Sequence, residues 1–191
     1  MTSRSRIIAI PGSMSQSSVN LSLIRSIIQN FSDRLDIKVF TGLSAIPHFN
    51  PDLDNENPPE NVSNFRRQLK QADGILICTP EYAMGVPGTL KNAIDWASRP
   101  SDKYPRSAVF SGKFAAMMSS SPGSLGGVRS LSHLRGVLTS ISVNVLPQEI
   151  AVPFAEEKFA GDDEEMIDET IKARLEELGA LLVEMLEKTH C

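Results

Sequence analysis

The chain has 191 residues, of which 41% are hydrophobic and 22% charged, and its formal net charge is −4. These values predict one globular domain, residues 1–191, with a hydrophobic core of its own. The negative charge argues against a nucleic-acid partner, and the longest apolar runs, 74–79 and 114–118, are too short to span a membrane. The four apolar residues before Pro11 are too few for a secretory signal, so we expect a cytoplasmic protein.

Short apolar runs alternate with longer segments of helical periodicity, a pattern typical of a parallel sheet covered by helices. Residues 41–59 are rich in Pro, Asn and Asp and are expected to form a long loop. The last helix is expected to bury Ile167, Ile171, Leu175, Leu178, Leu182 and Met185. In chain order we expect a strand at 6–10, helix 20–34, strand 37–40, helix 61–71, strand 74–79, helix 89–97, strand 114–119, helix 128–140, strand 143–146 and a helix at about 164–188.

Five strands alternating with five helices predict an α/β fold of the flavodoxin-like, doubly wound type. The expected parallel sheet has strand order 2-1-3-4-5 and carries helices on both faces. Cysteine and histidine are sparse and show no metal-binding spacing, so no metal site is expected. Cys78 lies in an apolar run and is expected to be a small buried residue, without a disulfide to the terminal Cys191.

In such a sheet, ligands bind beyond the carboxyl ends of the strands, where the winding reverses. The first loop at that edge, residues 12–20, is rich in serine and runs into a helix. Hydroxyl groups and a helix N-terminus together predict a cradle for one phosphate group. The alternative is an ordinary helix cap made by Ser17 or Ser18.

Two further loops at the same edge have unusual compositions. In residues 79–88, Pro80 and Pro87 stiffen the chain and Tyr82 offers a flat face to an aromatic ring. Residues 119–127 are mostly Ser, Gly and Pro, which suits the polar edge of a planar ligand. The alternatives are that loop 79–88 is simply rigid, with Tyr82 over the sheet edge, and that loop 119–127 is simply mobile. The occurrence of three such loops at consecutive positions favours a ligand site.

With these loops, the chain resembles the NADPH-dependent FMN reductase family, which includes quinone, azo-dye and chromate reductases. The likeness runs from the first strand to the fifth, and loop 12–20, the Gly126-Gly127-x-Arg129 turn and residues 46–52 support it. Its most specific part is Thr79-Pro-Glu-Tyr-Ala-Met-Gly-Val-Pro-Gly-Thr-Leu-Lys-Asn-Ala-Ile-Asp-Trp96.

The resemblance implies bound FMN and assigns its contacts to the three loops. Ser13, Ser18 and Asn20 would hold the phosphate, with Ser15 and Val19 beside them. The isoalloxazine would be lined by Pro80, Glu81, Tyr82 and Ala83, through stacking of Tyr82 and backbone hydrogen bonds. The pyrimidine edge would be closed by Ser120, Ser121, Pro122 and Gly123.

Three positions depart from the family pattern. The family often has Arg at the position of Ser15, Asn at that of Ala83 and Ser at that of Gly85. Without the guanidinium, the phosphate loses a bidentate contact, so FMN would bind more weakly or depend on hydroxyl groups and the helix dipole.

The resemblance also implies an enzyme in which NADPH or NADH reduces FMN and a small acceptor reoxidises it in a ping-pong reaction. Quinones, azo compounds, metal oxyanions and free flavin are candidate acceptors. The flavin carries the chemistry, so no catalytic side chain is expected, and Glu81 is assigned a backbone role. A homodimer or homotetramer is implied.

Two alternatives to this enzyme are a flavodoxin-like electron carrier and a scaffold that has lost FMN. Electron carriers are usually strongly acidic around the flavin. A net charge of −4, with cations such as Lys91, Arg99 and Arg129 near the site loops, favours the enzyme. Substitution at Ser15 and Ala83 is the feature that would favour the scaffold.

Overall fold

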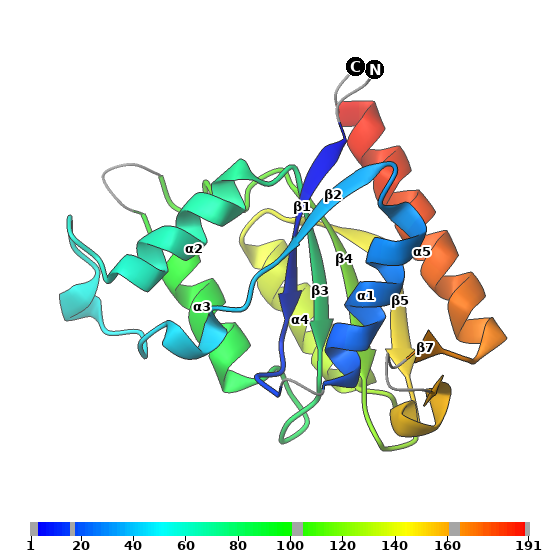
Figure 1. Ribbon diagram of the computed structural model, residues 1–191. Helices are drawn as coiled ribbons and strands as arrows, with labels where there is room; N and C mark the ends of the chain where they lie inside the picture. Colours follow the sequence, from blue (N-terminus) through cyan, green and yellow to red (C-terminus); the bar gives the residue numbers. More distant parts are fainter. Residues whose placement is uncertain (1–3, 16–17, 101–104, 161–164, 190–191) are drawn as a thin grey trace.

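The computed structural model describes residues 4–15, 18–100, 105–160 and 165–189. Figure 1 shows a twisted parallel sheet between two layers of helices. The strands are β1 (Ser5–Pro11), β2 (Leu35–Val39), β3 (Gly74–Thr79), β4 (Phe114–Ser120) and β5 (Asn144–Val152). The helices are α1 (Val19–Phe31), α2 (Glu60–Gln71), α3 (Gly88–Ser98), α4 (Val128–Ser140) and α5 (Glu169–Thr189). The strand order β2-β1-β3-β4-β5 confirms the flavodoxin-like fold predicted from the sequence.

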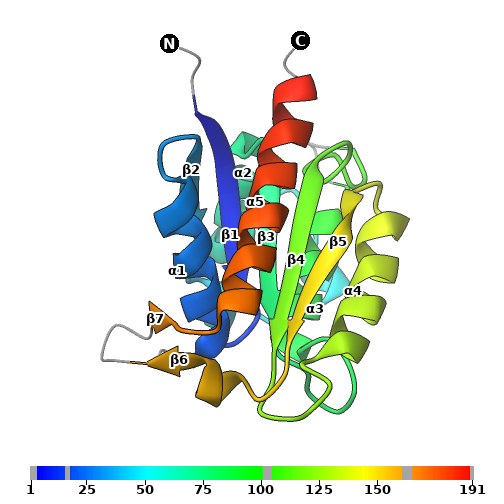
Figure 2. The same ribbon diagram turned by 90° about the vertical axis from the view of Figure 1, so that its right-hand side faces the viewer.

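Each face of the sheet has its own hydrophobic core. On one face, α2, α3 and α4 enclose Phe65, Trp96 and Phe110. On the other face, α1 and α5 pack over the sheet with Ile24 and Leu182 at the contact, and Figure 2 shows both helices in front of it. Every residue of β3 is buried because this central strand is covered on both faces. Its Cys78 is buried as predicted.

The fifth strand is longer than the sequence pattern predicts. It continues to Val152 instead of ending at Leu146. The pattern is interrupted at Pro147, which cannot donate a backbone hydrogen bond and lies where the register between β4 and β5 shifts. An edge strand tolerates such an interruption, so β5 resumes and carries the chain to the site edge of the sheet.

The last helix begins later than predicted, at Glu169. The preceding residues Glu165–Met166 form β7, which pairs with β6 (Phe159–Ala160), and the predicted start at Glu164 lies outside the described residues. The carboxylate of Asp168 accepts a hydrogen bond from the N–H of Ile171 at 3.1 Å, which marks the true start of the helix. Ile167 therefore precedes the helix and is exposed, contrary to the prediction that it is buried.

Other boundaries shift by a few residues. Helix α1 ends at Phe31 instead of Arg34, and β2 begins at Leu35 instead of Ile37. The long loop 41–59 contains two short 3-10 helices, η1 (Leu43–Ala45) and η2 (Pro51–Leu53), and a third, η3 (Ala155–Lys158), follows β5. Within the described parts of the chain, no helix is long and apolar enough to cross a membrane.

Gly179 of α5 lies against Phe31 of α1. A Cβ placed on it would overlap the ring of Phe31, which is itself buried. We expect Gly179→Ala to lower the free energy of unfolding by about 1–3 kcal/mol, because the buried ring has to move. Urea denaturation followed by circular dichroism measures this change.

Gly136→Ala is the matched control, since Gly136 also lies inside a helix but an added Cβ there meets nothing within 4 Å. Alanine forms helices better than glycine, so we expect this variant to gain about 0.5–1 kcal/mol. Equal effects of the two substitutions would contradict the packing role of Gly179.

Candidate functional site

The loops that follow β1, β3 and β4 meet at the carboxyl edge of the sheet, at the bottom of Figure 1. The N–H of Gly12 donates to the carbonyl of Cys78 at 2.7 Å, which joins the first loop to the end of β3. A Cβ on Gly12 would lie 2.9 Å from Oγ1 of Thr79, so the approach requires glycine. The three loops that the sequence singled out are therefore neighbours in space.

The first loop and the start of α1 form a set of hydroxyl and N–H groups. Ser18 is buried and caps the helix, with its Oγ accepting from the N–H of Asn20 at 3.3 Å. Ser13 is half-buried, and its Oγ accepts from the N–H of Ser15 at 3.2 Å. The first turn of α1, beginning at Val19, contains no acidic residue. The partial positive charge of this helix end thus remains available to an anion.

The side chain of Asn20 connects all three loops. It is buried, and its Oδ1 accepts from the N–H of Ser120 and from Sγ of Cys78, each at 3.2 Å. The family resemblance assigned Asn20 to the phosphate, and the sequence did not reveal this bridge because its partners lie 58 and 100 residues away. A contact between Asn20 and a phosphate stays a prediction.

The second loop makes a tight turn that presents Tyr82 to solvent. Tyr82 and Gly85 exchange two backbone hydrogen bonds, of 3.1 and 3.0 Å, around Ala83 and Met84. Both central residues have left-handed backbone angles, φ 48° and 63°, as in a type I′ turn. The Tyr82 side chain is 57% exposed. Its ring is accessible to a planar ligand that enters from this edge.

Glu81 uses its carboxylate to join the second loop to the start of α4. One oxygen accepts from Nε of Arg129 at 2.7 Å, and the other accepts from the backbone N–H of Arg129 at 3.1 Å. The side chain is only 8% exposed. The hydrogen bond from Arg129 lowers the pKa of Glu81, and the backbone N–H groups of α4 act in the same direction. The family resemblance implied only a backbone role for Glu81, and nothing in the sequence paired it with Arg129, which lies 48 residues away.

The third loop is held in place by two glycines with positive φ. Gly126 and Gly127 have φ values of 61° and 87°, and Oγ of Ser119 donates to the Gly126 carbonyl at 2.7 Å. A Cβ on Gly126 would lie 2.7 Å from the backbone N of Pro153. Ahead of these glycines, Ser120 is buried, Ser121 is half-buried, and Pro122 and Gly123 are exposed. The N–H groups of Ser120, Ser121 and Gly123 already donate to Oδ1 of Asn20, the carbonyl of Val152 and Oγ of Ser121, so this part of the loop presents a small, partly exposed surface to a ligand.

A family comparison decides the class of this protein. The family model for NADPH-dependent FMN reductase matches residues 5–157. The chain belongs to this family. This FMN reductase homologue is 33% identical over 177 residues to an NAD(P)H-dependent FMN reductase of Pseudomonas aeruginosa, with 92% of each chain covered.

Two further relatives agree with this assignment. The quinone reductase of Escherichia coli K12 is 33% identical over 147 residues, which cover 76% of each chain. Among solved structures, the flavoenzyme NAD(P)H:(acceptor) oxidoreductase FerB from Paracoccus denitrificans superimposes with a TM-score of 0.85 at 28% identity, covering 96% of this chain and 98% of that one. The prediction that the chain is an oxidoreductase of this family is confirmed.

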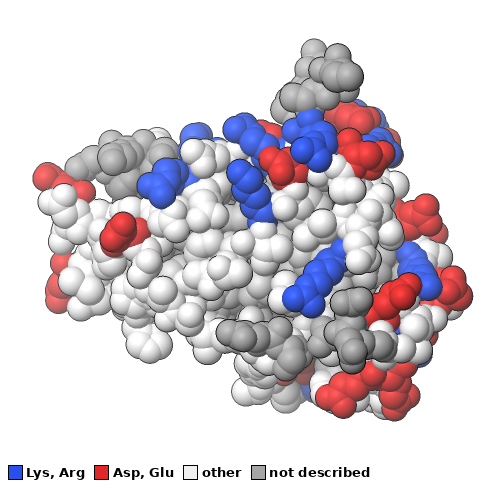
Figure 3. Space-filling view, in the orientation of Figure 1, with Lys and Arg blue, Asp and Glu red and all other residues white. Residues whose placement is uncertain are grey.

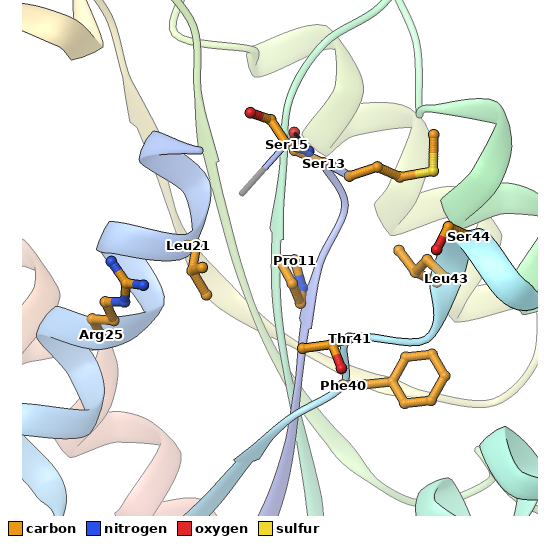
Figure 4. A pocket seen from close by; sticks show the side chains of 10 residues that line it. Pro11, Ser13, Ser15, Leu21, Arg25, Phe40, Thr41, Leu43 and Ser44 are labelled. Atoms are coloured by element: carbon orange, nitrogen blue, oxygen red, sulfur yellow. Dashed lines mark hydrogen bonds between the residues drawn. The ribbon is translucent and has the colours of Figure 1, made fainter. Parts of the chain in front are cut away.

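A pocket of about 530 Å³ opens on the β2 side of the serine-rich loop of this reductase (Figure 4). Three segments surround it: the loop after β1, the first half of α1 and the chain that follows β2. Its lining residues are Pro11, Ser13, Met14, Ser15, Leu21, Arg25, Phe40, Thr41, Leu43 and Ser44. In the described part of the chain, no group of three or more His, Cys, Asp or Glu residues is placed to hold a metal ion.

The Glu81–Arg129 contact predicts a specific pH dependence of stability. Because the folded-state pKa of Glu81 is lowered, the contact stabilises the fold fully above the ordinary Glu pKa and is lost as the pH falls through the folded value. We expect Glu81→Gln to lose about 1–3 kcal/mol of unfolding free energy at pH 7. Below the folded pKa of Glu81 the difference from wild type should vanish. Urea titrations between pH 7 and pH 3 measure both values.

Glu184→Gln provides the control, because Glu184 pairs with Lys188 on the exposed face of α5. An exposed pair of this type contributes little to stability, because solvent and salt screen the two charges. The ionic capping of α4 would be contradicted if Glu81→Gln lost no more unfolding free energy than Glu184→Gln, or if its loss did not change with pH.

Proposed function

We propose that this protein is an FMN-containing reductase that oxidises NADPH or NADH and passes the electrons to a small acceptor of the quinone type. Azo compounds, metal oxyanions and free flavin belong to the same range of acceptors. The observation that carries the proposal is the position of an acid-free helix N-terminus, that of α1, on the same sheet edge as the exposed ring of Tyr82. The helix N-terminus suits a phosphate and the Tyr82 ring suits a flat ring, and FMN contains both a phosphate and a flat ring.

The residues present fit FMN. Ser13, Ser18 and the first-turn N–H groups of α1 would hold the phosphate. Ser15 provides a hydroxyl and no positive charge, so the phosphate depends on neutral donors and the helix dipole. The loop segments 80–83 and 120–123 would meet the ring system, with Tyr82 against its face. These contacts do not require the side chain that Ala83 lacks.

Bound FMN would supply the redox chemistry, accepting a hydride from the reduced nicotinamide and returning two electrons to the acceptor. The protein binds, orients and shields the reacting groups. Glu81 is unsuited to donate a proton, because Arg129 holds it ionised through the lowered pKa. A catalytic acid is also unnecessary, since a reduced quinone takes its protons from solvent.

The site is open enough for the two substrates to use it in turn, which supports a ping-pong reaction. Tyr82 and Met84 are both more than half exposed, and the neighbouring residues 121–123 are small. Similarity to a quinone reductase of Escherichia coli supports a quinone as acceptor.

We propose that the protein acts as a homodimer or homotetramer. Exposed apolar side chains surround the site edge, namely Tyr82, Met84, Leu125, Val128 and Phe154. Contact with a second copy of the chain would remove this apolar surface from water.

The spectrum of the purified protein tests the proposed reaction. After incubation with FMN and desalting, we expect a retained flavin absorbance that NADPH or NADH bleaches under anaerobic conditions. A quinone added afterwards should restore the absorbance. Failure to retain FMN would support the scaffold, whereas retention without bleaching would support an electron carrier that another enzyme reduces.

Ser13→Ala tests the phosphate site within the same assay. Loss of one hydroxyl contact should weaken FMN binding about tenfold, which corresponds to the usual contribution of a hydrogen bond to a charged group. Riboflavin lacks the phosphate, so its affinity should not change. Ser121→Ala is the control, because Ser121 lies at the predicted pyrimidine edge and should affect both flavins alike. Equal weakening of both flavins by Ser13→Ala would contradict the assignment.

A further inference from the structure

The pocket beside the serine-rich loop shares Ser13 and Ser15 with the proposed FMN phosphate site but lies apart from the residues proposed to meet the flavin ring. None of residues 80–83 or 120–123, which would meet the flavin ring, lines it. The loop of residues 12–15 separates the two compartments: Ser13 and Ser15 contribute to this pocket, while Gly12 contacts the end of β3. The pocket thus adjoins the predicted phosphate site on the flank opposite the flavin ring.

One side of the pocket is suited to an anion. Arg25 projects from α1, and Figure 4 shows its guanidinium directed along the helix toward Leu21, the direction in which helical side chains lean. The hydroxyl groups of Ser13, Ser15, Thr41 and Ser44 surround the same space. No acidic residue is among the described residues that line it.

The described side chains on this face include few acidic ones near its middle. The chain carries a net charge of −4, yet among the described residues Figure 3 shows most of the acidic side chains of this face near its edges, with the middle largely uncharged. An anion that approaches the pocket therefore meets little repulsion from the described side chains.

The other side of the pocket is apolar. Phe40 and Leu43 are buried and form a fixed wall. Met14 is 58% exposed, and its flexible thioether side chain can adapt to a flat ring. A guanidinium and hydroxyl groups opposite an apolar wall match a phosphorylated purine nucleoside. The volume of about 530 Å³ lies within the usual range of small-molecule sites.

We propose that this pocket binds the adenosine 2′-phosphate end of NADPH and that Arg25 recognises the 2′-phosphate. The inference rests on the proposed function, since that reaction brings a reduced nicotinamide to the flavin side of the same loop. A dinucleotide would then extend from the flavin face to the pocket. Only NADPH carries the 2′-phosphate, so the bidentate contact to Arg25 makes the enzyme prefer NADPH to NADH.

Binding of adenosine 2′,5′-bisphosphate to the FMN-loaded protein tests the pocket directly. By isothermal titration calorimetry, this probe should bind at least tenfold more tightly than 5′-AMP. Arg25→Ala should weaken it roughly 10- to 100-fold, the loss expected for a hydrogen-bonded charge pair, and Arg25→Lys should recover part of the affinity. Arg67→Ala is the control, because Arg67 is an exposed arginine of α2 outside the pocket.

Steady-state kinetics supply the second readout. In Arg25→Ala, the ratio of the KM for NADPH to the KM for NADH should rise at least tenfold. The kcat with saturating NADPH should change little. Equal affinity of the wild type for the two probes would overturn the proposal. So would a loss of FMN affinity in Arg25→Ala without any change in the ratio of the two KM values, since Arg25 would then belong to the flavin phosphate site.

The two proposals fail in different ways. If the wild type oxidises neither NADPH nor NADH, the proposed function is wrong, whatever the calorimetry shows. If it oxidises both with equal KM and binds both probes equally, the reductase stands and the 2′-phosphate site is wrong.

Discussion

The carboxylate of Glu81 at the N-terminus of α4 determines how the site edge is arranged. Two neighbouring helices, α1 and α4, begin at this edge, and each presents the partial positive charge of its first turn. At α4 the chain supplies its own anion, because Glu81 accepts from the backbone N–H of Arg129 as well as from its guanidinium. At α1 the first turn is free of acidic residues. In the proposed function the phosphate binds at α1, which would place the rest of the flavin toward the loops after β3 and β4.

The same contact keeps those two loops at a fixed separation. Glu81 belongs to the loop after β3, while Arg129 follows the loop after β4. Asn20 adds a second connection, from α1 to the N–H of Ser120. Because both connecting side chains are almost fully buried, water competes poorly for their hydrogen bonds. The site is thus assembled by polar contacts between loops that stand on a rigid apolar sheet.

Much of this architecture could be predicted from the sequence. Apolar periodicity located every strand of the main sheet and every long helix, since burial on a covered sheet repeats in a regular way. The errors have local causes. Pro147 interrupts the strand pattern, so the second half of β5 was not predicted. The short strand β7 occupies residues that periodicity alone assigned to α5. Neither case could be recognised without knowing which strand lies alongside.

The site was predictable as a set of loops but not as a set of contacts. Small and hydroxyl residues identify loops that approach a ligand, whereas the partners of Asn20 and Glu81 depend on the distance between chain segments in space. The pocket containing Arg25 illustrates the same limit, because its lining comes from residues 11–15, 21–25 and 40–44. No motif joins these three segments.

The turn that carries Tyr82 has a consequence for the exchange of ligands. Its shape is set by the left-handed backbone of Ala83 and Met84 and by two backbone hydrogen bonds, not by packing of the exposed side chains. Such a turn keeps its form whether or not a ring lies against it. Cofactor binding then orders little additional chain, so most of the entropy lost at this edge was already lost when the protein folded. Tyr82 would therefore meet the proposed flavin in the same position each time the cofactor binds.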